Sequence, residues 1–185
     1  MDTGLAEVFT HDPAIPILSL LAHALVGAGR TQEGLSASHQ ALLLARQTRP
    51  PETVAALTAA ALLAAARRDP ARTHGLAAEL LALAQTHGLV MYVGLGSILL
   101  GWAQIQLAGD ATDREQALAR VREAQDRYTR SGARTFTPLV AVLHSESELA
   151  AGHPEESRAV AEVGIRSAEQ HDVRLWWDRL TSLTR

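Results

Sequence analysis

The sequence of 185 residues contains no cysteine, which excludes disulfides and thiolate chemistry. It also contains no lysine and no asparagine. A phosphate-loop lysine, a Schiff-base lysine and N-glycosylation are therefore excluded too. Aromatic residues make up only 4% of the chain and hydrophobic residues 47%, so small aliphatic side chains must build the core. Alanine and leucine dominate that set, and they favour closely packed helices over sheets.

The chain also has little excess charge of either sign. Charged residues make up 20% of the chain and leave a net charge of −3, which speaks against disorder and gives no basis for direct nucleic-acid binding. No apolar run reaches the ~18 residues of a spanning helix without a glycine or polar interruption. The N-terminus lacks a basic stretch followed by an apolar one. We therefore expect a folded, cytoplasmic protein that contacts neither nucleic acid nor membrane.

Small residues recur about every 40 positions along the chain. The first series is Gly34, Gly75, Ala117 and Ser157. Seven positions further on, a second series consists of Ala41, Ala82, Ala124 and Gly164, and upstream lies a third series of Ala22, Ala61, Gly101 and Ser145. Small residues seven apart share one helical face and mark where another helix approaches closely. The pattern predicts a repeat protein.

Glycine and proline divide each repeat into two helices. Asp69 followed by Pro70 reads as an N-cap with proline at the first helical position, Pro154 repeats the signal, and residues 112–115 read as a capping box. The predicted helix pairs span 14–47, 53–86, 90–130 and 137–170, and a partial ninth helix spans 173–183. We predict an all-α fold, a single helical-repeat domain over 1–185 in which each pair buries its apolar face against its neighbours.

The small-residue pattern resembles the tetratricopeptide (TPR) motif. Ala22, Gly29, Gly34 and Ala41 fall at the spacings of that motif, and Ser145, Gly152, Ser157 and Gly164 match them in the fourth unit. Longer helices and turns extend the period beyond the standard 34 residues. The resemblance implies an α-α superhelix, a TPR-like solenoid.

Three segments, 87–103, 128–134 and 175–180, carry a more particular resemblance. They look like the degenerate TPR region at the C-terminal end of large bacterial signalling proteins. Those proteins join this region to a STAND/AAA-type nucleotide-binding domain, with an adenylate/guanylate cyclase or LuxR-type DNA-binding domain elsewhere in the chain. The resemblance implies an attached nucleotide-binding or cyclase domain as a partner. It also implies a role in signal transduction or transcriptional regulation.

The sequence offers no catalytic, metal or cofactor constellation. The eight histidines include no pair at i, i+4, and His23 and His39 on consecutive helices are interpreted as satisfied polar residues. Residues 94–97 resemble part of a phosphate-binding loop, but they lie within a helical pattern and follow no strand. We therefore predict a protein that is not an enzyme and needs no cofactor.

What remains is a surface for binding. In TPR-like superhelices the first helix of each pair lines the concave face, and residues at i, i+4 and i+7 form its ridge. The candidates are Ser19, His23 and Val26; Thr58, Leu62 and Ala65; Ile98, Trp102 and Ile105; and Val142, Glu146 and Leu149. The groove is expected to be apolar, with Trp102 at its centre and His23 and Glu146 as polar groups. A core position for Trp102 is the competing interpretation.

Three functions fit these features. The first is a non-catalytic protein–protein interaction or regulatory module that binds a protein or peptide along the groove. The second is an inducer-sensing domain of a LuxR-type regulator, for which a closed pocket with converging polar groups is the expected sign. The third is self-association into a homodimer through the end of the ninth helix, with Leu175, Trp176, Leu180 and Leu183.

Overall fold

The computed structural model describes residues 13–132, 136–170 and 176–185, and the described residues form α-helices without any strand. The predicted all-α fold is confirmed. The helices are α1 (Ala14–Gly27), α2 (Thr31–Ala45), α3 (Pro50–Ala66), α4 (Pro70–Thr86), α5 (Val90–Leu107), α6 (Ala111–Arg130), α7 (Thr137–Ala151), α8 (Pro154–Gln170) and α9 (Trp177–Leu183). Of the predicted ninth helix, positions 173–175 lie outside the described residues.

Local chemistry sets the helix ends. The Asp69 carboxylate accepts from the Arg72 N–H at 3.0 Å, and Pro70 follows at the first helical position, as predicted. The predicted capping box at 112–115 is wrong: α6 begins two residues earlier, because the Asp110 carboxylate caps it by accepting from the Asp113 N–H at 2.9 Å. Among the described residues, four glycines with positive φ lie just after helices, and one of them is Gly152 after α7 (φ 96°).

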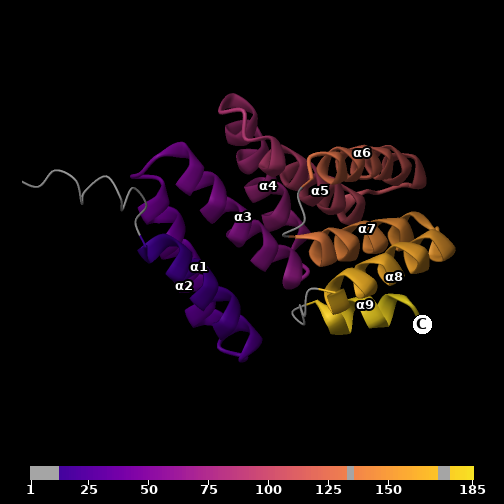
Figure 1. Cartoon of the computed structure of the whole chain (residues 1–185), viewed down its shortest axis with the longest axis horizontal. Coiled ribbons are helices and arrows are strands. Elements are labelled where there is room, and N and C mark those ends of the chain that lie inside the picture. Colours follow the sequence, from indigo (N-terminus) through magenta and orange to yellow (C-terminus); the bar gives the residue numbers. More distant parts are fainter. Residues whose placement is uncertain (1–12, 133–135, 171–175) are drawn as a thin grey trace, which may run out of the picture.

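The helices pack in an order that follows the chain (Figure 1). Each helix contacts the next one, and each odd-numbered helix also contacts the next odd-numbered helix, from α1·α3 to α7·α9. Within the described residues, the backbones of two even-numbered helices never come close, although Arg46, directly after α2, pairs with Glu79 of α4 at 2.8 Å. From α3 onward burial follows the same division, since twelve of the 17 residues of α3 and eleven of the 15 of α7 are buried, against four of 17 in α4. The odd-numbered helices α3, α5 and α7 therefore form the inner layer.

The small residues of three repeats lie at helix contacts, as predicted. A Cβ on Gly101 would stand 2.5 Å from Val121 Cγ2, and one on Gly164 would stand 2.6 Å from Ala141 Cβ. A Cβ on Gly34 would stand 2.7 Å from the Ala22 carbonyl oxygen. These positions have no room for a larger side chain.

The second repeat corrects the predicted register. Gly75 and Ala82 are exposed, and a Cβ on Gly75 would meet nothing within 4 Å. The buried small residues of α4 are Ala77 and Ala84, which are also seven positions apart and fully buried. Alanine is so frequent here that the sequence spacing alone selected the wrong pair, two positions too early.

Helix α5 is the most apolar long helix and has the length and hydropathy (1.4 over 18 residues) of a membrane-crossing helix. Half of that stretch is buried within the structure. Leu95, Ile98, Leu99 and Trp102 are all at most 1% exposed, packed between α3, α4, α6 and α7. Such burial is the pattern of a core helix.

Candidate functional site

A cavity of about 590 Å³ opens on the side of the odd-numbered helices. It begins between α1 and α3 and extends to α5, to the start of α7 and to Trp176 beside α9. Its lining residues are Ile15, Pro16, Ser19, Leu20, His23, Pro51, Glu52, Ala55, Ala56, Thr58, Ala59, Leu62, Tyr92, Phe136, Leu139 and Trp176. Even-numbered helices contribute none of them. Twelve of the sixteen are apolar or aromatic, so the wall is suited to apolar ligands.

His23 is one of the polar groups of this wall. Its Nε2 lies 3.0 Å from the Ala59 carbonyl oxygen, which is purely an acceptor, so Nε2 must carry the proton of that bond. Burial lowers the pKa of His23 below its usual 6.5, and the bond to Ala59 opposes this shift. His23 is therefore neutral at neutral pH, and its other ring nitrogen, Nδ1, is a hydrogen-bond acceptor. No described residue donates to Nδ1.

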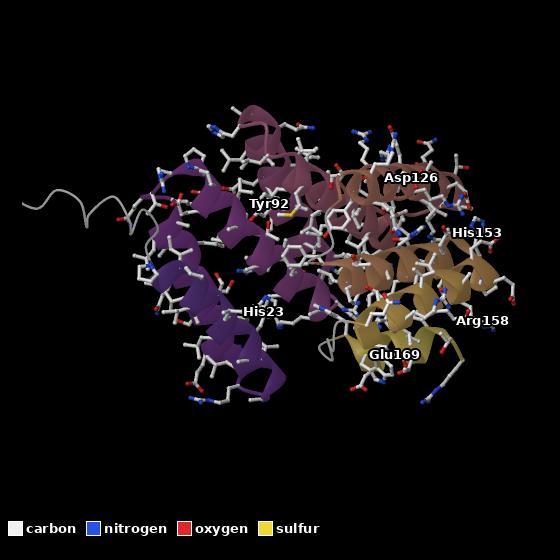
Figure 2. All side chains as sticks on the ribbon, in the orientation of Figure 1. His23, Tyr92, Asp126, His153, Arg158 and Glu169 are labelled. Carbon is white, nitrogen blue, oxygen red and sulfur yellow. The ribbon has the colours of Figure 1, made fainter. Side chains whose placement is uncertain are left out.

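Hydroxyl groups complete the polar part of the wall. Ser19 donates to the Ile15 carbonyl at 2.9 Å and Thr58 to the Val54 carbonyl at 2.8 Å, so both are satisfied within their own helices. Burial raises the pKa of the Tyr92 hydroxyl, which therefore stays protonated. The Tyr92 hydroxyl makes no hydrogen bond to a residue that the structure describes. His23 from α1 and Tyr92 from α5 both line the cavity, and Figure 2 shows them on either side of α3.

A buried ion-pair cluster stands beyond the α9 end of the cavity. The Glu146 carboxylate, 6% exposed, accepts from Arg179 Nη2 at 2.6 and 2.5 Å, from Trp102 Nε1 at 2.9 Å and from Arg68 Nη2 at 3.3 Å. The Arg179 guanidinium also lies over the Trp176 ring, 5.5 Å from its centroid. Trp176 thus joins the cavity wall to the cluster that fixes α9 against α7.

The predicted ridge divides between these surroundings. Ser19, His23 and Leu62 line the cavity, together with Thr58. Ile98, Trp102, Ile105 and Val142 are at most 1% exposed and belong to the core, and Glu146 lies in the ion-pair cluster. Ala65 is fully buried and Leu149 is half-exposed away from the cavity. Neighbouring helices cover the ridge residues from Ile98 to Glu146, so this part of the ridge is not open to a ligand in this structure.

A second polar cluster was missed by the sequence analysis. The buried Glu148 carboxylate accepts from Arg122 at 2.8 and 2.6 Å and lies 2.9 Å from His144 Nε2 and 3.1 Å from His153 Nδ1. Burial raises the pKa of Glu148, but the bonds from Arg122, His153 and His144 outweigh it, and the net shift is downward. Burial lowers the pKa of His144. The spacing of His144 and Glu148, four apart, was the available sequence signal.

This second cluster links α6 and α7 to His153, the residue directly before α8, and Figure 2 shows His153 far from His23. Its His153 also lies 3.0 Å from a Glu115 carboxylate oxygen, so both ring nitrogens face carboxylates. Among the described residues, no group of three or more His, Asp or Glu side chains is arranged to hold a metal ion. The arrangement is that of a structural ion-pair network.

The end of the ninth helix is packed in part. Leu180 is fully buried against Gly164, where its Cδ2 would stand 2.8 Å from an added Cβ. Trp176 lines the cavity and Leu183 is half-buried, whereas Leu175 lies outside the described residues. Among the described residues, the large apolar side chains with the greatest exposed fraction are instead Leu20 (72%) and Ile17 (61%) on α1, and Val90 (69%) at the start of α5.

Comparisons of the chain with protein-family models, with curated proteins and with solved structures gave no match. The resemblance to the TPR-like region of bacterial signalling proteins therefore stays a prediction. The described residues define a class of protein: an all-helical chain of sequentially packed helices with an apolar cavity on the side of its odd-numbered helices.

Proposed function

We propose that the chain is a single, non-catalytic TPR-like domain that binds a protein or peptide partner as part of a bacterial signalling or transcriptional regulator. The pattern of contacts between helices supports a TPR-like superhelix, because the backbones of successive odd-numbered helices contact one another while those of even-numbered helices stay apart. Such an order places the first helix of every pair on one side. In this proposal the partner is either a separate cytoplasmic protein or an attached nucleotide-binding or cyclase domain.

The cavity is the observation that carries the proposal. Its wall comes from α1, α3, α5 and α7, and it is apolar with few polar groups, which is the composition of binding sites in general. An apolar side chain of a partner, inserted there, would bury surface at ~25 cal/mol per Å². The exposed Leu20 at the rim of the cavity extends the apolar surface that a partner segment would cover.

A cavity-filling variant tests this use of the site. Ala55 lines the cavity on an exposed position of α3, so Ala55→Phe should obstruct the cavity without disturbing the core. Ala78 occupies an exposed position of α4 away from the cavity, so Ala78→Phe is the matched control. Random displayed peptides selected on the unmodified chain should lose most of their affinity for Ala55→Phe and keep it for Ala78→Phe. Selected peptides that bind both variants equally would refute the cavity as the partner site.

A second function, inducer sensing, is favoured by the size of the cavity, although the cavity is open to the surface and mainly apolar rather than closed with converging polar groups. A cavity of about 590 Å³ is within the range of small-molecule sites. By comparison, three turns of a partner helix, about 16 Å long and about 10 Å wide, occupy roughly 1,300 Å³. A thermal-shift screen tests this alternative, because a ligand that binds the folded state raises the unfolding temperature until the site saturates. Compounds that shift the unmodified chain and Ala55→Phe equally would argue against it.

A further inference from the structure

The described part of the cavity wall disfavours a charged ligand. Among its described lining residues, Glu52 is the charged one, and its carboxylate already accepts from Arg49 Nη2 at 3.2 Å while being 7% exposed. No described arginine lines the cavity. A ligand carboxylate or phosphate placed against these described residues would lose its hydration and gain no cation from them in exchange, and an ammonium group would compete with Arg49 for the Glu52 carboxylate.

Two groups of the wall remain available for hydrogen bonds. The Nδ1 of His23 is an acceptor, because Nε2 carries the ring proton and donates it to the Ala59 carbonyl. No described residue donates a hydrogen bond to Nδ1. The Tyr92 hydroxyl is both a donor and an acceptor, and it has no described partner. A ligand that offers an O–H would satisfy His23 by donating to Nδ1.

We propose that the cavity binds an uncharged, mainly apolar small molecule bearing a hydroxyl group, which donates its hydrogen bond to Nδ1 of His23. The apolar body of the molecule lies against the aliphatic wall formed by α1 and α3 and against the ring of Trp176. This inference rests on the second proposed function, in which the cavity is a small-molecule site, and it specifies the ligand class.

Four probes with one hydrocarbon chain test the class: n-decanol, decanoate, decylammonium and decyl methyl ether. Isothermal titration calorimetry with the full chain at neutral pH should give saturable binding of n-decanol, with decanoate and decylammonium at least about tenfold weaker. The ether accepts but cannot donate, so it should also bind more weakly than n-decanol. A charged probe that equals or exceeds the alcohol would overturn the ligand class and leave small-molecule sensing intact.

Variants assign the binding to this cavity and to His23. Ala55→Phe should abolish n-decanol binding, and Ala78→Phe should keep it. In His23→Phe the preference for n-decanol over its methyl ether should disappear, because the acceptor is gone, and the change in that ratio is independent of a general loss of affinity. An unchanged preference in His23→Phe overturns the assigned contact. Absence of binding by all four probes overturns the ligand class, whereas the thermal-shift screen tests the sensing function and the peptide selection tests the protein-binding function separately.

Discussion

Replacing Gly34 by alanine should destabilise the chain, whereas the same replacement at Gly75 should stabilise it. Both glycines lie inside helices, where alanine is favoured over glycine by about 1 kcal/mol. At Gly75 an added Cβ would meet nothing within 4 Å, so the full gain is expected. At Gly34 the Cβ would stand 2.7 Å from both the Ala22 carbonyl oxygen and Val26 Cγ2. The former is a backbone atom that cannot rotate away.

Overpacking of this kind costs roughly 1–3 kcal/mol. Because backbone atoms must move to admit the methyl group of Gly34→Ala, we take the upper part of that range, about 2–3 kcal/mol. Subtracting the helix gain of about 1 kcal/mol leaves a net loss of about 1–2 kcal/mol. The two variants should therefore differ by about 2–3 kcal/mol, which corresponds to roughly 4–12 °C between their unfolding temperatures for a chain of this size.

Thermal unfolding followed by far-UV circular dichroism measures this difference directly. The unmodified chain should unfold between the two variants, with Gly75→Ala above it and Gly34→Ala below it. If Gly34→Ala unfolds at the same temperature as Gly75→Ala or higher, α1 and α2 do not approach as closely as described, and the reasoning about small residues at helix contacts fails.

Three further predictions concern the core and its titratable groups. Glu146→Leu leaves the Arg179 guanidinium and the Trp102 N–H without their acceptor, and urea unfolding should show a loss of about 3 kcal/mol or more; an unchanged stability would contradict the cluster. Trp102→Ala should cost about 3–5 kcal/mol in the same assay, as for a core position, and a loss below about 1 kcal/mol would place its ring outside the core. Burial lowers the pKa values of His23 and His144, so the unfolded chain binds more protons below pH 6.5, and the free energy of unfolding should fall as the pH drops through that window and fall less in His144→Gln.

The helices were predictable because their boundaries are local. Asp69 with Pro70 before α4 and Gly152 after α7 act through the few backbone groups next to them, so the sequence carries the whole signal. The cap of α6 was misplaced because Asp110 and Thr112 both have the required chemistry, and the geometry of the preceding turn decides between them.

The faces of the helices were harder to predict. Helix α4 contains two pairs of small residues seven positions apart, Gly75 with Ala82 and Ala77 with Ala84. The seven-residue spacing therefore fits more than one register. Burial of Ala77 and Ala84 is decided by how α4 lies on α3 and α5, which is a tertiary property.

The candidate site was predicted only where it is built from the first two helix pairs. Ser19, His23 and Leu62 share a side because of their helical spacing and because α1 contacts α3. Tyr92 and Trp176 reach the same cavity from distant parts of the chain, and Arg179 meets Glu146 across 33 residues. Such juxtapositions depend on the stacking angles between repeats, which no local pattern records.

The claim that the inner-layer cavity is the binding site is tested most directly by methyl NMR during a titration with n-decanol. The account predicts saturable shift changes at the methyl groups of Ala55, Ala59 and Leu62, which line the cavity, with Ala78 on α4 unaffected. Shift changes that spare these three methyl groups, or that are as large on the even-numbered helices, would contradict it.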